Sequence, residues 1–246
     1  MNKYSFRYNN KKYEIKYPKS VSSDKKEIWK NKELQPSKIL QEIFERGIIK
    51  MNDEEIKLHS SVSPLEGSII YNLIRENKMR KSLEIGMANG ISTLYFLEGL
   101  KSINNEYKHI SIDPYQDSQW KGVGRYLVKK SGLDDNHRLL KLKSYIGLPK
   151  LLEKKYSFDI IFIDGMHLYD YTLIDLFYSI LLCKIGGVII IDDYWMKSIK
   201  DLKKYIDKNY SNFLEEIKIE NFRTSIIYIK KSEDNREWNY HKNICE

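Results

Sequence analysis

The sequence predicts an α/β protein built on a doubly wound, mostly parallel sheet, and three features of the chain indicate this fold. From about residue 64 onward, short apolar segments alternate with segments whose apolar residues recur at helical spacing. Two short segments, "DIIFI" at 159–163 and "GVIII" at 187–191, are apolar on both faces, which is typical of strands covered by helices on both sides. Glycine or aspartate ends several of these segments, at the strand ends where doubly wound sheets bind ligands.

The pattern predicts each element in turn. Alternating aromatic residues around Asn9-Asn10 predict a β-hairpin over residues 3–17, and "SKILQEIFERGII" predicts a helix over 37–49. A further helix is expected over 64–78. Strands are then predicted at 82–86, 109–113, 138–142, 158–163 and 187–192, with helices at 91–101, 119–131, 146–155, 168–183 and 196–209. Two strands near the C-terminus, at 213–219 and 223–231, should pair antiparallel, which makes the sheet seven-stranded and Rossmann-like.

The length of 246 residues fits one α/β domain with additions. We expect an N-terminal extension over 1–60, a hairpin with helices that serves as a lid or oligomer contact. The main domain should cover 61–232, and a tail should cover 233–246. The chain has no run of 18 apolar residues and no apolar leader segment, and its only cysteines are Cys183 and Cys245. We therefore expect a cytoplasmic protein without a membrane span or a disulfide framework.

The formal net charge of +8 admits nucleic acid or another acidic partner. Only eight of the 42 basic residues are arginine, the better bidentate reader of phosphate and guanine. The lysines are scattered along the whole chain. The pattern therefore favours a composition bias over a nucleic-acid surface.

The segment "SLEIGMANGISTLYF", residues 82–96, indicates a ligand loop between a strand and a helix. Its glycines, Gly86 and Gly90, allow a tight turn and a close approach to a ligand, and the helix start offers free N–H groups. The next strand ends in Asp113, where a carboxylate suits a grip on ribose hydroxyls. The alternatives are an ordinary tight turn and a helix cap. Both features together, in register with the strands, favour a nucleoside site.

Four segments carry a resemblance to a known family: "LEIGMANGIST", "IDPY", "FDIIFIDGMHLYDY" and "GGVIIIDDYW". Over about residues 64–230 the chain resembles class I S-adenosylmethionine-dependent methyltransferases of the metal-dependent O-methyltransferase type. It is most similar to the macrocin and mycinamicin sugar enzymes, and more distantly to the catechol and caffeoyl-CoA enzymes. The resemblance implies S-adenosyl-L-methionine as cofactor. It assigns cofactor contacts to Glu84, Gly86, Met87, Gly90, Ser92, Asp113, Ser144 and Asp164. Met87-Ala88-Asn89 departs from the small residues that many relatives carry in this loop.

Acidic residues end two neighbouring strands of the predicted sheet. Asp164 follows one strand, and Asp192 and Asp193 follow the next, so their carboxylates should converge above the sheet. Clustered carboxylates repel one another unless a cation neutralises them, and oxygen ligands select hard ions such as Mg²⁺. The resembling family places its divalent metal at these three positions. The alternatives are a helix cap at Asp164 and a turn at Asp192-Asp193.

His167 lies three residues beyond Asp164 and fits the general base that a neutral hydroxyl acceptor requires. A histidine at this offset is typical of the sugar enzymes and tilts the prediction toward a hydroxyl of a sugar, glycan or related small molecule. Its alternative is a surface residue. Trp120, Arg125 and Tyr126 either line the acceptor pocket or pack in the core, and the same choice applies to Trp195.

Two other functions stay open: an RNA methyltransferase, motivated by the charge, and a catalytically silent binding protein with the same fold. An antibiotic-pathway hydroxylase shares similar motifs, so the reaction type is not closed by motifs alone. We expect a small-molecule acceptor, no nucleic acid and a possible homo-oligomer.

Overall fold

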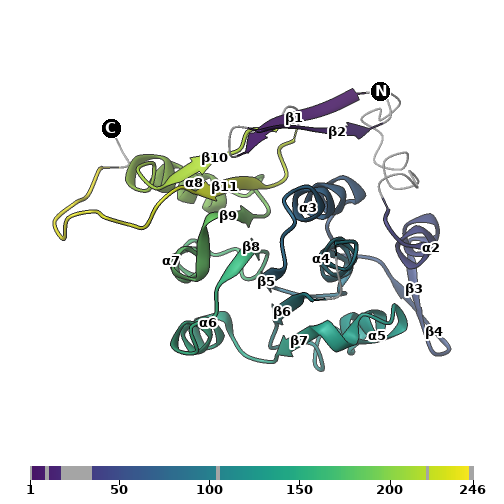
Figure 1. Ribbon diagram of the computed structural model, residues 1–246. Helices are drawn as coiled ribbons and strands as arrows, with labels where there is room; N and C mark the ends of the chain where they lie inside the picture. The colour runs from purple at the N-terminus through teal and green to yellow at the C-terminus, as the bar shows by residue number, and fades with distance from the viewer. Residues whose placement is uncertain (1, 9–10, 18–34, 104–105, 220–221, 244–246) are drawn as a thin grey trace.

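The computed structural model of the chain describes residues 2–8, 11–17, 35–103, 106–219 and 222–243, with side chains from residue 35 onward. Figure 1 shows a central sheet with helices on both of its faces. The seven strands lie in the order β10-β11-β9-β8-β5-β6-β7. Their bounds are β5 Lys81–Ile85, β6 Lys108–Ile112, β7 His137–Leu140, β8 Phe158–Ile163, β9 Cys183–Ile191, β10 Leu214–Glu216 and β11 Ile226–Lys230.

The strand directions confirm the predicted doubly wound sheet. The neighbours from β9 to β7 all pair in parallel. β11 pairs antiparallel with β9, and β10 pairs antiparallel with β11, as expected for the two strands near the C-terminus. The chain order reverses beside β5, which has β6 on one side and β8 on the other. Such a switch point is where open α/β sheets bind ligands.

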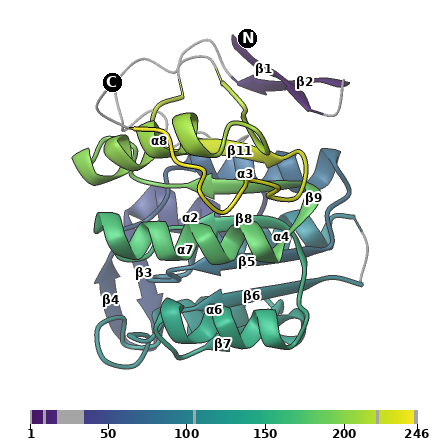
Figure 2. The same cartoon turned by 90° about the vertical axis from the view of Figure 1, so that its left-hand side faces the viewer.

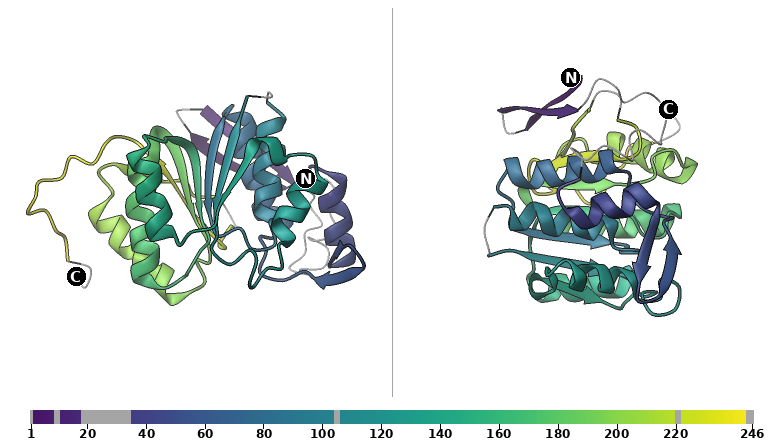
Figure 3. Two further views of the ribbon diagram at one scale, coloured as in Figure 1. Left: turned by 90° about the horizontal axis from the view of Figure 1, so that it is seen from below. Right: turned by 90° about the vertical axis from the view of Figure 1, so that its right-hand side faces the viewer.

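Two helix layers cover the sheet. The helices α3 (Pro64–Glu76), α4 (Ile91–Lys101) and α5 (Val123–Lys130) lie on one face, and α6 (Ser144–Glu153), α7 (Tyr169–Leu182) and α8 (Lys197–Asn209) lie on the other (Figure 3). Figure 2 faces this second layer. Strand β8 serves both layers, because Phe162 packs into the core under α4 while Ile161 and Ile163 pack under α7. Each such side chain contributes roughly 1.5–3 kcal/mol through burial, which explains why the strand is apolar throughout.

The predicted helix over 37–49 ends earlier than expected. Helix α2 covers Lys38–Arg46, and Gly47 ends it with a φ of 66° while its N–H donates to the Ile43 carbonyl at 2.8 Å. Glycine tolerates this left-handed conformation, and it is a common helix end. The next residues form a small antiparallel hairpin of β3 (Ile48–Met51) and β4 (Glu54–Lys57). The sequence prediction missed this hairpin because Ile48 and Ile49 also continue the apolar pattern of the helix.

Helix α5 begins at Val123 rather than at 119, after Gly122 with a φ of 73°. The predicted N-terminal hairpin is confirmed in its strands, β1 (Asn2–Tyr8) and β2 (Lys11–Tyr17), which pair with Tyr8 opposite Lys11. Its Asn9-Asn10 turn lies outside the described residues, as does Cys245. A lid or oligomer role for residues 1–60 stays a prediction. Within the described ranges, every helix is too short or too polar to cross a membrane.

Candidate functional site

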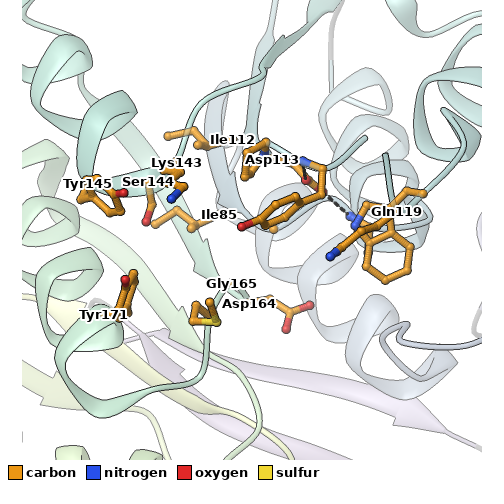
Figure 4. A pocket seen from close by; sticks show the side chains of 16 residues that line it. Ile85, Ile112, Asp113, Gln119, Lys143, Ser144, Tyr145, Asp164, Gly165 and Tyr171 are labelled. Carbon is orange, nitrogen blue, oxygen red and sulfur yellow. Dashed lines mark hydrogen bonds between the residues drawn. The ribbon is translucent and has the colours of Figure 1, made fainter. Parts of the chain in front are cut away.

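A cavity of about 330 Å³ opens at the carboxyl ends of β5, β6 and β8. Figure 4 shows Ser144 and Tyr145 on one side of it and Gln119 on the opposite side, with Asp113 and Asp164 between them. The residues that line it are Ile85, Gly86, Ala88, Ile112, Asp113, Pro114, Tyr115, Gln119, Trp120, Lys143, Ser144, Tyr145, Asp164, Gly165, Met166 and Tyr171. The cavity has the size and mixed lining of a small-molecule site.

Gly86 brings the ends of β5 and β8 close together. Its φ is 91°, and a Cβ there would lie 1.9 Å from the backbone oxygen of Asp164. Only glycine fits this conformation and this space. Backbone hydrogen bonds hold the approach, since the N–H of Gly86 donates to the Ile112 carbonyl at 2.9 Å and that of Asp164 donates to the Ile85 carbonyl at 2.9 Å. The predicted glycine loop is therefore a tight turn that also forms a wall of the cavity.

The Asp113 carboxylate ties this loop to the end of β6. Its Oδ2 accepts from the backbone N–H of Met87 at 3.2 Å and of Ala88 at 2.9 Å. Gln116 Nε2 donates to the same oxygen at 3.0 Å, and the Tyr115 N–H donates to Oδ1 at 2.7 Å. These contacts fix the orientation of the carboxylate at the cavity wall. Asp113 thus lines the cavity and also shapes the loop, and its contact with ribose hydroxyls stays a prediction.

Glu84 is placed differently from the prediction. It is fully buried, and its carboxylate accepts from Ser92 Oγ at 2.9 Å, from Ser111 Oγ at 2.6 Å and from Thr93 Oγ1. Burial opposes its ionisation, but His109 and the hydroxyl donors outweigh this and lower the pKa of Glu84. Glu84 and Ser92 therefore join β5, α4 and β6 inside the fold and do not line the cavity.

Met87 and Gly90 also lie off the cavity wall. Met87 is buried, and Gly90 lies against the backbone of Gly124 in α5. Of the predicted cofactor residues, Gly86, Asp113, Ser144 and Asp164 line the cavity, and the other four support the loop from within. Sequence spacing cannot separate these two roles, because both sets belong to the same strand–loop–helix unit.

Three tyrosines form an aromatic wall of the cavity that was not predicted from the sequence. Tyr145 and Tyr171 meet edge to face with their ring centroids 6.1 Å apart, and Tyr115 lies two residues after Asp113 in the chain. Each lies within three residues of a strand end or in the first turn of a helix, and this position is the signal that could have found them. Trp120 also lines this cavity, whereas the sequence suggested either an acceptor pocket or core packing for it. Arg125 instead pairs with Asp117, and Tyr126 packs against the core.

A polar cluster adjoins the cavity, and Asp164 belongs to both. His167 Nε2 lies 3.7 Å from Asp164 Oδ1 and 3.0 Å from Asp193 Oδ2. One ligand atom from each of Asp164, His167 and Asp193 lies within 4.8 Å of the other two. All three side chains are mostly buried, with 23–29% of each exposed. Burial and the neighbouring carboxylate of Asp193 raise the pKa of Asp164.

Asp192 does not join this cluster, which corrects the predicted carboxylate trio. Its Oδ1 accepts from Ser225 Oγ at 2.7 Å, and the same hydroxyl lies 3.0 Å from Glu66 Oε1 in α3. Burial and the charges of Glu66 and Asp164 raise the pKa of Asp192. Both residues lie beyond the end of β9, and Asp193 has a φ of 55°, so the two consecutive carboxylates face different surroundings.

Three large apolar side chains are exposed in the segments that carry the cluster. Met166 and Leu168 flank His167 in the loop after β8, and Trp195 follows Asp193. Their exposed fractions are 51%, 54% and 67%. We call Met166, Leu168 and Trp195 the apolar rim. Trp195 is therefore not a core residue, and its place in an acceptor pocket stays a prediction.

Residues 83–194 match the family model of a methyltransferase domain. The fold is that of the class I methyltransferases. A Staphylococcus aureus protein assigned as a caffeoyl-CoA O-methyltransferase has a TM-score of 0.62 at 18% identity, over 85% of this chain and 100% of that one. An O-methyltransferase from Bacillus cereus in complex with S-adenosylhomocysteine has a TM-score of 0.57 at 18% identity, over 70% and 84% of the two chains.

The O-methyltransferase TomG from Streptomyces achromogenes, involved in tomaymycin synthesis and bound to S-adenosylmethionine, is also similar. Its TM-score is 0.57 at 14% identity, over 70% of this chain and 82% of that one. No curated protein sequence matches the chain significantly. The chain thus has the fold of the class I methyltransferases, which it shares with these O-methyltransferases, and residues 83–194 match a methyltransferase domain, in agreement with the broader part of the resemblance. The finer likeness to the macrocin and mycinamicin enzymes stays a prediction.

Proposed function

We propose that the protein is an S-adenosylmethionine-dependent O-methyltransferase that acts on a hydroxyl of a sugar, glycan or related small molecule. One observation carries the proposal: Asp164 lines the nucleoside-sized cavity and also belongs to the Asp164–His167–Asp193 cluster. A methyl donor in the cavity and an acceptor at the cluster would therefore be neighbours. The apolar rim beside the cluster suits an acceptor with an apolar ring face.

The residues of the cavity fit the cofactor. Asp113 offers an oriented carboxylate for the ribose hydroxyls. Trp120 and Tyr145 offer aromatic faces for the adenine, and Ser144 offers a hydroxyl. Similar proteins from Bacillus cereus and Streptomyces achromogenes hold this cofactor or its demethylated product in their structures. These features support the cofactor predicted from the sequence.

The cluster fits a hard divalent cation such as Mg²⁺. Asp164 and Asp193 offer carboxylate oxygens, and their proximity raises the pKa of Asp164, a cost that a cation would remove. A divalent cation bound there would lower the pKa of the acceptor hydroxyl. We assign it to the two carboxylates, because the one nitrogen of His167 that faces them cannot both ligate a cation and accept a proton.

His167 is the proposed general base. The oxygen that gains the methyl group must lose its proton, and Nε2 of His167 can accept it. The resulting N–H would donate to Asp193 Oδ2, which lies 3.0 Å away. Asp193 would thereby hold the imidazole in place and stabilise its charged form.

Calorimetric titration tests this assignment. We expect S-adenosylhomocysteine to bind the purified chain, and Mg²⁺ to give a second heat that a chelator removes. Asp193→Asn should remove the Mg²⁺ heat and keep the S-adenosylhomocysteine heat, because Asp193 does not line the cavity. His167→Ala should keep both heats and abolish methyl transfer in a screen of sugar acceptors.

Each part can fail separately. An absence of S-adenosylhomocysteine binding would favour the catalytically silent alternative. Loss of the Mg²⁺ heat in His167→Ala would make His167 a ligand rather than a base. Full activity of His167→Ala would end the base assignment.

A further inference from the structure

Trp195 makes a polar contact that its surface position does not require. Its side chain is 67% exposed, yet its Nε1–H donates to Asp193 Oδ1 at 2.7 Å. An exposed indole can satisfy its single N–H with water at little cost. The contact therefore matters more for Asp193 than for Trp195, because it fixes a carboxylate oxygen beside the polar cluster.

The two oxygens of Asp193 have different partners. Oδ1 accepts from Trp195, and Oδ2 lies 3.0 Å from His167 Nε2. A rotation of the carboxylate about its last bond would break at least one of these contacts. Asp193 itself has a φ of 55°, a left-handed conformation in which aspartate is one of the better tolerated residues. The backbone places the side chain at the cluster, and the indole then sets its orientation.

We propose that Trp195 is a positioning residue, whose indole N–H holds the Asp193 carboxylate in the orientation that cation binding beside Asp164 requires. The inference rests on the proposed function, since it takes Asp193 as a cation ligand. Groups that hydrogen-bond to a ligating carboxylate orient it before the cation arrives, and their loss typically weakens metal binding by 10–100-fold. Because Trp195 is exposed, we expect the lower end of this range, about tenfold.

The Met196 N–H donates to the Asp193 carbonyl at 2.9 Å, so a backbone turn also constrains this segment. That turn fixes the main chain of Asp193 but does not contact its carboxylate. The turn does not involve the indole, so replacing the ring should leave it intact. Removal of the N–H alone thus separates the two effects.

The test measures Mn²⁺ and Mg²⁺ affinity calorimetrically on the full chain saturated with S-adenosylhomocysteine. Trp195→Phe keeps an aromatic ring and removes the N–H, whereas Trp195→Gln removes the ring and keeps an N–H donor. Trp238→Phe is the matched control, because Trp238 is 94% exposed on the C-terminal tail. We expect Trp195→Phe to bind the cations about tenfold more weakly. Trp195→Gln should bind more tightly than Trp195→Phe, and Trp238→Phe should match the wild type.

Affinity for S-adenosylhomocysteine and the thermal midpoint should not change in Trp195→Phe, because Trp195 lines neither the cavity nor the core. Unchanged cation affinity in this variant overturns the positioning role and leaves the proposed function intact. A wild-type chain that binds S-adenosylhomocysteine but no cation overturns the proposed metal site and the role of Trp195 together.

Discussion

Asp175 is a buried acid that the proposed chemistry does not use. It lies in α7 with 1% exposure, and its Oδ1 has no hydrogen-bond partner among the described residues. Burial raises the pKa of Asp175 to about 6, although a hydrogen bond with Ser144 partly opposes this. Ser144 lines the cavity, so Asp175 supports its wall from behind. An acid held in this way is more stable protonated than ionised.

We therefore predict that Asp175→Asn stabilises the protein at pH 7.5 and not at pH 4. A folded-state pKa of about 6 lies above the ordinary value of 3.8, so the folded state binds the proton more tightly. Stability from this group is complete below about pH 4 and is lost as the pH rises through 6. The shift corresponds to roughly 3 kcal/mol at most.

Urea unfolding of both proteins across this pH range measures the effect. The quantity to compare is the difference between their free energies of unfolding at each pH. Burial and His109 lower the pKa of His137 to about 4, so His137 makes the stability of both proteins rise with pH, and the difference removes this contribution. A difference between wild type and Asp175→Asn that does not change with pH would contradict the prediction.

The sequence predicted correctly which residues lie at the cavity when they directly follow a strand of the parallel sheet. Gly86, Asp113 and Asp164 follow strands of the parallel sheet, and the structure brings them to one cavity. The direction of a side chain was less predictable, because beyond the end of a strand it depends on backbone angles that the sequence pattern does not reveal. Asp193, with a φ of 55°, reaches the polar cluster, whereas the neighbouring Asp192 accepts a hydrogen bond from Ser225 instead.

The elements that form the cavity meet through glycine contacts. Gly124 lies in the first turn of α5, and a Cβ there would lie 3.0 Å from the Ala88 carbonyl and 2.9 Å from Met87 Cε. Ala88 lines the cavity and has a φ of 46°, a conformation that costs a non-glycine residue free energy. The start of helix α5 is thus in close contact with the Met87–Ala88 loop that the cofactor would contact.

Gly124→Ala should therefore weaken S-adenosylhomocysteine binding without destabilising the fold. Alanine favours a helix over glycine by up to about 1 kcal/mol, which offsets strain in α5 itself. The carbonyl of Ala88 must shift by a few tenths of an ångström, and we expect roughly tenfold weaker binding, about 1.4 kcal/mol. Calorimetry and thermal unfolding measure the two effects, with Lys129→Ala on the exposed side of α5 as control. Equal affinity in Gly124→Ala and wild type would show that the loop tolerates the contact.

Periodicity predicted the order and type of the sheet and helix elements, because each strand and helix has its own apolar spacing. Element ends were harder, since glycines in left-handed conformations decide them. Gly47 ends α2 and Gly122 precedes α5, but the same residues also fit inside the surrounding pattern. The sequence alone offers no signal that distinguishes a capping glycine from an ordinary one.

At the scale of the whole molecule, the net charge of +8 is interspersed with acidic groups. In α8, Lys197 and Lys204 pair with Asp201 at 2.6 and 2.9 Å, and Lys203 pairs with Asp207 at 2.6 Å. The two pairs of Asp201 lie at the surface, where such pairs contribute about 0–1 kcal/mol each and matter little for stability. They do lower the local positive potential that a phosphate backbone would need.

The polar cluster also disfavours RNA binding, because the carboxylates of Asp164 and Asp193 would repel a phosphodiester. We therefore predict that a single-stranded RNA probe binds weakly at 150 mM salt, at a level of about 10⁻⁴–10⁻⁶ M that is typical of non-specific contacts and falls steeply as salt rises. Binding of S-adenosylhomocysteine should change little over the same salt range, because the cavity contacts of its uncharged nucleoside are screened far less. Fluorescence anisotropy and calorimetry at two salt concentrations measure both. Tight RNA binding that survives high salt would favour the RNA methyltransferase alternative and would move the acceptor from a small hydroxyl compound to a nucleic acid.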